Sequence, residues 1–202
     1  AAPGAAMAGI TLREALRTST YIKLILAIFT TYLLLQAMMV HLVPVLSNGG
    51  LPRTEAVAIA GLMGVGMVLG KIIVGFLLDR LDSRLVAAIT LAVAAVGILS
   101  LSIGGAPAPV RMLSVLMFGL GTGGVSPIYP YLTARWFGMA SFGRLYGATT
   151  SIYALAHSLG PISASRVYDS THSYQLILAT APLMLIIPIA LIWSLGKAPA
   201  PK

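Results

Sequence analysis

One lysine interrupts a long apolar stretch of this 202-residue chain. Lys71 lies eight positions before Asp79, where the stretch ends. If the stretch is a transmembrane helix, a rise of about 1.5 Å per residue places Lys71 about 12 Å into a bilayer whose midplane is about 15 Å deep. A lysine there costs about 2.5–3.5 kcal/mol on insertion scales and usually faces a bundle interior or a water-filled cavity. We interpret Lys71 as a cation that binds an anionic substrate; the alternative is a lysine that extends to the membrane surface.

Other polar side chains in apolar stretches are candidates to line the same cavity. They are Tyr153, His157, Gln36 and Tyr129. Each has an alternative interpretation, because a histidine in a helix bundle is usually neutral and hydrogen-bonded, and tyrosines often anchor a helix at the membrane surface. No acidic residue lies in the middle of another apolar stretch to neutralise Lys71. A bound anion is therefore expected to do so, and either Lys71 or His157 could be the titrating group if transport is coupled to protons.

The composition places the chain among membrane proteins. Hydrophobic residues make up 58% and charged residues only 9%, and the mean hydropathy is +0.94. These values exclude an ordinary soluble globular domain. The net charge of +8 comes from basic residues scattered singly between apolar runs, which does not favour a nucleic-acid partner. The chain has no cysteine and no motif of a metalloprotease, a phosphate-binding loop or a serine hydrolase, so we expect neither an enzyme nor a metal or other cofactor.

Six apolar segments are long enough to cross a bilayer as helices. Their continuous, non-alternating character predicts an all-α membrane protein rather than a β-barrel. The expected spans are 22–46, 55–78, 85–103, 111–134, 145–166 and 174–195. They form one bundle over 22–195, with a linker at 1–21 and a tail at 196–202. The opening stretch of small residues predicts that the chain is part of something longer.

The basic residues predict an orientation. With the N-terminus on one side, that side holds nine of them: Arg13, Arg17, Lys23, Arg80, Arg84, Arg135, Arg144, Lys197 and Lys202. The opposite side holds three, namely Arg53, Arg111 and Arg166. By the positive-inside rule both termini are expected in the cytoplasm of an inner or plasma membrane, and the positive charge would interact with the cytoplasmic leaflet of the lipid bilayer.

Glycines and prolines are concentrated in the fourth span. Residues 118–132 read FGLGTGGVSPIYPYL. Small residues permit close helix packing, whereas a weakened hydrogen-bond ladder permits bending, which a transporter needs. Both interpretations remain open from the sequence.

Two stretches resemble a known family. The segment GLMGVGMVLGKIIVGFLLDRLDSR is similar to the degenerate copy of the major facilitator signature GxxxDRxGRR after the eighth helix. Gly75, Asp79, Arg80 and Arg84 match it, whereas Asp82 and Ser83 depart from it. The segment ARWFGMASFGRLYGATTSIYALAHSLGPISASRVYDSTHSY resembles the tenth-to-twelfth-helix region of monocarboxylate and oxalate/formate carriers. The chain thus resembles the C-terminal six-helix half of a twelve-helix major facilitator transporter.

The resemblance implies functional roles. Lys71 stands four residues before Gly75, where these carriers place a basic residue that contacts the substrate carboxylate. Gly75, Asp79, Arg80 and Arg84 would serve the conformational switch. Dicarboxylate carriers add a basic group on the eleventh helix, where this chain has Tyr153 and His157, so a monoanion is favoured.

A secondary transporter of a small organic anion is the function expected, with a missing N-terminal half or a second copy as partner. Alternatives are a major facilitator carrier of sugars or drugs, and a non-transporting receptor or assembly partner.

Overall fold

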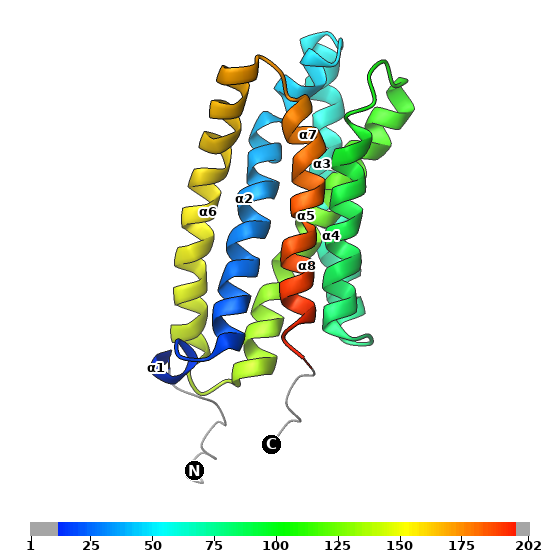
Figure 1. Cartoon of the computed structure of the whole chain (residues 1–202). Helices are drawn as coiled ribbons and strands as arrows, with labels where there is room; N and C mark the ends of the chain where they lie inside the picture. Colours follow the sequence, from blue (N-terminus) through cyan, green and yellow to red (C-terminus); the bar gives the residue numbers. More distant parts are fainter. Residues whose placement is uncertain (1–11, 197–202) are drawn as a thin grey trace.

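A computed structural model of the chain describes residues 12–196. Over these residues the regular structure is entirely helical, as predicted. In chain order the helices are α1 (Leu12–Ala15), α2 (Ser19–Asn48), α3 (Arg53–Leu78), α4 (Ser83–Ser100), α5 (Ala108–Phe137), α6 (Phe142–Thr171), α7 (Gln175–Met184) and α8 (Ile186–Trp193). The long helices form an upright bundle, and α1 and the end of α8 lie at the same end of it (Figure 1). Residues 1–11 and 197–202, with Lys197, Lys202 and most of the expected linker and tail, lie outside the described residues.

Helices α2 to α6 overlie the first five predicted spans, with different ends. α4 ends at Ser100 rather than at residue 103, and residues 101–105 form turns and a bend. Asp82 caps α4 by accepting a hydrogen bond from the Arg84 backbone N–H at 2.9 Å. Within the expected linker, Leu12–Ala15 form the short helix α1, and the side chain of Ala15 is fully buried. This part of the linker packs on the bundle.

The sixth predicted span, 174–195, is divided into α7 and α8 at Leu185. Pro188 explains the break, because a proline has no N–H to donate to the carbonyl four residues earlier, and its ring collides with that carbonyl. The carbonyl concerned belongs to Met184, the last residue of α7. The two short helices continue in one direction (Figure 1), so they still form a single run across the bundle.

Glycines set the distance between α3 and α5. A methyl group on Gly70 of α3 would strike the backbone of Leu120, and one on Gly123 of α5 would strike the carbonyl of Met67. Close approach through small residues is a common way for membrane helices to pack. Of the two interpretations of the glycine-rich span, the structure thus supports close packing at these positions, and the contact fixes the height at which the next residue, Lys71, meets α5.

The helices α2 and α6 form a second tightly packed pair. Gly160 of α6 lies against the Leu33 carbonyl of α2, where a methyl group would not fit. Near the other end of the pair, the hydroxyl of the buried Tyr21 donates a hydrogen bond to the Leu145 carbonyl at 3.0 Å. α4 packs on α5 and α7, and α8 packs on α2. The bundle is therefore built from an α2–α6 pair and an α3–α5 pair.

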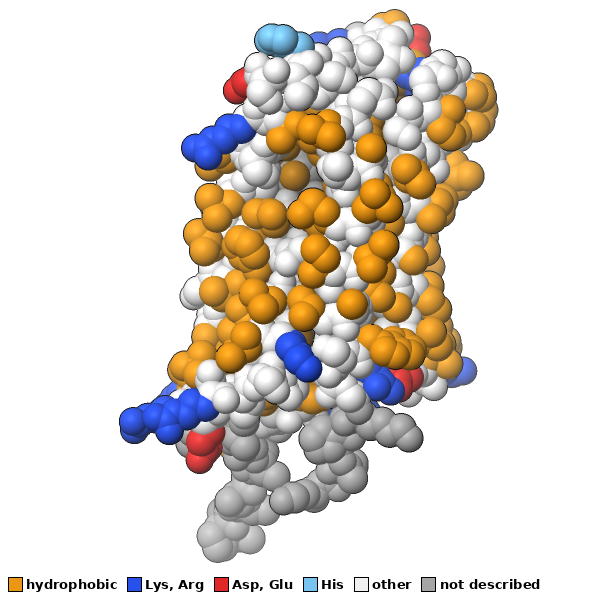
Figure 2. Space-filling model, in the orientation of Figure 1, with side chains coloured by type: hydrophobic (Ala, Val, Ile, Leu, Met, Phe, Trp, Pro, Cys, Tyr) orange, Lys and Arg blue, Asp and Glu red, His pale blue; other side chains and the backbone are white. Residues whose placement is uncertain are grey.

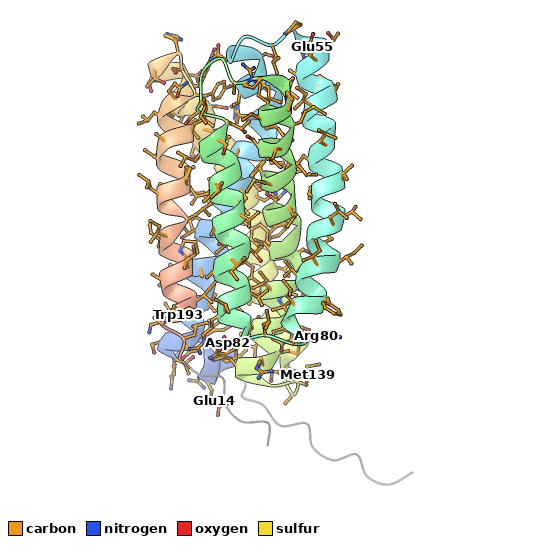
Figure 3. All side chains as sticks on the ribbon, turned by 90° about the vertical axis from the view of Figure 1, so that its right-hand side faces the viewer. Glu14, Glu55, Arg80, Asp82, Met139 and Trp193 are labelled. Carbon is orange, nitrogen blue, oxygen red and sulfur yellow. The ribbon has the colours of Figure 1, made fainter. Side chains whose placement is uncertain are left out.

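The outer surface suits a lipid environment. Hydrophobic side chains cover the middle of the bundle and basic side chains concentrate toward its ends (Figure 2). The labelled charged residues Glu55, Arg80 and Asp82 likewise lie at the ends (Figure 3). Within the described residues, α2, α3, α4, α5 and the α7–α8 run are long and apolar enough to cross a membrane. α6, although 30 residues long, is not among these helices, because it carries many hydroxyl-bearing side chains.

Candidate functional site

A cavity of about 270 Å³ lies where the two helix pairs meet. α2 contributes Ile28, Tyr32 and Gln36; α3 contributes Met67 and Lys71; α5 contributes Thr122, Gly123, Ser126, Tyr129 and Pro130; and α6 contributes Tyr146, Thr149, Thr150 and Tyr153. Most of the polar lining groups are neutral hydroxyls. The polar character of α6 thus has a structural reason, since four of the polar side chains in its first half line this cavity.

Lys71 is the only charged side chain among these lining residues, all of which belong to the described part of the chain. It is exposed and makes no hydrogen bond or ion pair with another described residue. An ammonium group that lacks a counter-ion and faces a cavity is a ready site for an anion. Its flexible stem and compact charge attract a carboxylate without imposing the two-pronged geometry of an arginine.

Gln36 lies in the α2 wall of the same cavity. Only 6% of the residue is exposed, and its amide has no hydrogen-bond partner among the described residues. Among the described residues no side-chain nitrogen or oxygen that is shut off from solvent lacks a partner, so the amide atoms of Gln36 are accessible from the cavity. Such accessible polar groups pair with water or a ligand. The amide of Gln36 is therefore free to bind a molecule that enters the cavity.

Tyrosine rings form much of the wall on the α2–α6 side. The rings of Tyr32 and Tyr153 meet edge to face at 4.3 Å between centroids and 82°. Tyr146 stacks on Phe142 with centroids 5.4 Å apart. Aromatic pairs in such geometries stabilise one another, so they hold a preformed apolar surface beside the amide of Gln36.

The model of the Major Facilitator Superfamily matches residues 24–202. The chain belongs to the Major Facilitator Superfamily. Since the match covers most of the chain, and the described residues form an all-helical bundle with apolar helices long enough to span a membrane, the protein is a multi-pass integral membrane protein of a transporter family.

A solved structure shares the fold of this superfamily member. The chain is similar to the in meso crystal structure of the POT family transporter PepTSo, with a TM-score of 0.71 and 16% sequence identity. The alignment covers 91% of this chain and 39% of that chain, so this protein spans less than half of the transporter that it resembles. At this identity the likeness shows the fold alone. No curated protein matches the sequence.

Tyr129 contributes its ring rather than its hydroxyl to the cavity of this superfamily member. The hydroxyl lies 2.6 Å from the Thr31 hydroxyl and donates to the Ala27 carbonyl at 3.2 Å. These bonds join α5 to α2 at the floor of the cavity. Of the five residues predicted to bind substrate, four line the cavity, and in Tyr129 the polar group is occupied by the protein itself.

His157 is the one predicted binding residue that is not among the lining residues. Its exposed ring lies 5.4 Å from that of Tyr153, one turn further along α6. Another histidine, His41, has a structural role. Its Nε2 lies 3.2 Å from the Pro161 carbonyl and its Nδ1 lies 3.1 Å from the Tyr174 hydroxyl. Because a carbonyl only accepts, Nε2 carries the proton, and His41 joins α2 to α6 and to Tyr174, the residue just before α7.

The residues of the signature stretch lie at the end of the bundle where α3 meets α4. Asp79 ends α3, and the Arg80 guanidinium lies over the Phe76 ring at 4.1 Å from its centroid. Arg84 pairs instead with Asp82, at 2.8 Å. The hydrogen bond from the Arg84 side chain is the main reason that the pKa of Asp82 is lowered to about 2. Asp82 departs from the family signature, whereas Arg84 matches it, and the two residues form an ion pair.

Several lining residues are not among those that the sequence predicts. Tyr32 lies one turn before Gln36 on α2, while Thr149, Thr150 and Tyr146 lie one and two turns before Tyr153 on α6. Positions separated by three, four or seven residues share a helix face. This spacing from the predicted residues was the signal that could have found them.

Within the described residues, no group of three or more His, Cys, Asp or Glu side chains could hold a metal ion.

Proposed function

We propose that this bundle is one half of a secondary transporter that carries a small organic anion, a monocarboxylate, by alternating access. The observation that carries the proposal is Lys71, a cation without a counter-ion in a cavity whose lining holds no carboxylate. An ammonium there binds a carboxylate more strongly than a neutral solute, because opposite charges attract and no carboxylate of the lining competes for Lys71. The monocarboxylate and oxalate/formate branch of the superfamily is the membership that fits this arrangement.

A single charge supports a monoanion. The α6 wall presents Tyr153 and Thr150 rather than a second cation, so a second carboxylate of a dianion would enter the cavity unpaired. Burying an unpaired charge is expensive. The neutral hydroxyls in the lining favour one competing function, a sugar carrier, which competition between carboxylates and sugars distinguishes. A receptor that binds without moving its ligand would show binding without uptake.

Alternating access needs a second wall, because the cavity is open to one side of the bundle and Lys71 is exposed. Glycines on the outward face of α3 and α6, such as Gly64 and Gly147, have free space beside them, unlike the buried glycines. A six-helix partner, either an N-terminal half or a second copy, would pack against this face. Gly75, Asp79, Arg80 and Arg84 would regulate the change between states, with both termini in the cytoplasm, and Lys71 or His157 would titrate if protons are coupled.

The proposal is tested by uptake of a radiolabelled monocarboxylate into proteoliposomes that contain the complete protein with this bundle. We expect Lys71→Ala to abolish uptake and Lys71→Arg to retain part of it, because the charge is kept and only its geometry changes. The matched control is Lys23→Ala. Lys23 donates to the Ser194 carbonyl at 3.2 Å, away from the cavity, so its replacement should leave uptake intact.

Uptake by Lys71→Ala at the wild-type rate would refute the anion assignment. Full competition by sugars, with none by carboxylates, would assign the cavity to the sugar class instead.

A further inference from the structure

The cavity has two chemically different sides. The α3–α5 pair carries the charge, on Lys71, while the α2–α6 pair carries tyrosine rings and the amide of Gln36. A ligand that satisfies both sides needs a negative charge at one end and an uncharged, hydrogen-bonding group elsewhere. A short aliphatic acid meets only the first requirement.

Gln36 determines the kind of polar group. Its amide offers both donors and an acceptor, none of which has a partner among the described residues, and the amide is accessible in the cavity that Gln36 lines. A hydroxyl also donates and accepts, so it can pair with both ends of an amide. A second charged group on the ligand would bind there less favourably than a hydroxyl, because the nearby groups of the α2–α6 wall are neutral. A site with such an amide discriminates against ligands that leave the amide unpaired.

The tyrosines determine the shape of the ligand body. Tyr32, Tyr153 and Tyr146 line the same wall as Gln36, and the Tyr32 ring also lies 5.8 Å from the ring of Tyr129. An aromatic ligand can meet these rings edge to face or in offset stacks, whereas a saturated ring of similar size lacks the complementary charge distribution. A planar ring also lacks the internal flexibility that costs entropy on binding.

We propose that the substrate is a hydroxylated aromatic monocarboxylate. Its carboxylate pairs with Lys71, its ring lies against the wall that Tyr32 and Tyr153 form together, and its hydroxyl bonds with the amide of Gln36. This inference rests on the proposed anion transport and adds the class of anion to it.

Equilibrium binding to the complete protein tests the proposal with five probes: para-hydroxybenzoate, meta-hydroxybenzoate, benzoate, cyclohexanecarboxylate and propionate. We expect at least one hydroxybenzoate to bind about fivefold more tightly than benzoate, the factor that one net neutral hydrogen bond supplies. Benzoate in turn should bind better than cyclohexanecarboxylate, and propionate should bind most weakly.

Two variants separate the contributions. Gln36→Met keeps the side-chain length and removes the amide, so the preference for hydroxybenzoate over benzoate should disappear while benzoate binding persists. Tyr32→Leu should remove the preference for benzoate over cyclohexanecarboxylate. Matched controls are Gln175→Met, in α7, and Tyr131→Leu, whose hydroxyl accepts from Arg135. Neither residue lines the cavity, so both preferences should survive in the controls.

The outcomes distinguish this inference from the function on which it rests. If the protein binds carboxylates but prefers propionate, or if Gln36→Met keeps the hydroxyl preference, the aromatic hydroxy acid is overturned and anion transport stands. If none of the five probes binds, both are overturned.

Discussion

Replacement of Gly70 by alanine tests the helix contact that positions Lys71. The added methyl group would meet the backbone of Leu120 and lie 2.9 Å from the Gly124 nitrogen. Backbone atoms cannot rotate away as a side chain can, so α3 and α5 must separate. Overpacking costs about 1–3 kcal/mol, and a rigid neighbour places Gly70→Ala near the upper value. Alanine's helix preference over glycine returns about 1 kcal/mol, which leaves a net loss of about 2 kcal/mol.

Gly64→Ala is the matched control on the same helix. Nothing lies within 4 Å of a methyl group at Gly64, so only the helix preference remains and the chain should gain about 1 kcal/mol. The two variants should therefore differ by about 3 kcal/mol. For a chain of this size each kcal/mol shifts Tm by about 2–4 °C, so thermal unfolding of the 202-residue chain in detergent should show a difference of about 6–12 °C. Equal Tm values for Gly70→Ala and Gly64→Ala would refute the tight contact.

Two further predictions concern side chains that hold the helices in place. The pKa of Asp82 is lowered from 3.8 to about 2, mainly by the hydrogen bond from Arg84. Because the folded-state pKa lies below the unfolded one, the ionised carboxylate stabilises the fold above about pH 4, and this stabilisation is lost as the pH falls toward 2. Asp82→Ala should therefore cost about 1 kcal/mol near pH 7, through the lost helix cap, and this deficit in Tm should shrink between pH 4 and pH 2; a deficit that does not change over this range would contradict the role of the ionised carboxylate. His41→Ala should lower the free energy of unfolding by about 1–2 kcal/mol, because the Tyr174 hydroxyl and the Pro161 carbonyl lose their contact with the imidazole. Tm and monocarboxylate binding are measured on the same variant. Loss of binding with unchanged Tm would contradict a purely structural role.

The helical class of the fold could be predicted because long apolar runs leave few alternatives in a membrane. The break in the last helix and the polar character of α6 depend on a few individual residues. Pro188 breaks the last span at Leu185, although the sequence there is apolar throughout and predicts one helix. α6 is less apolar than its neighbours because its face with Thr149 and Thr150 lines the cavity. Hydropathy alone shows only a less apolar segment and does not indicate a cavity.

The candidate site was predicted in its charged part and incompletely in its neutral part. Lys71 was conspicuous because a charge in an apolar run is rare. Tyr32 was not, because a tyrosine in a membrane helix is ordinary and only the packing of α2 against α6 brings it to Tyr153. Tyr129 shows the opposite case, since its hydroxyl is bound to Thr31 by a contact between distant helices that the sequence does not reveal.

The central claim is that Lys71 holds the charge of the substrate. Equilibrium binding of radiolabelled benzoate to the complete protein, compared between wild type and Lys71→Gln, tests it most directly, because glutamine keeps a polar side chain and removes only the charge. We expect affinity to fall at least about tenfold in Lys71→Gln, the loss that follows when a charge-assisted hydrogen bond is removed, while Lys23→Gln binds as wild type does. Wild-type affinity in Lys71→Gln would show that Lys71 does not hold the charge of the substrate.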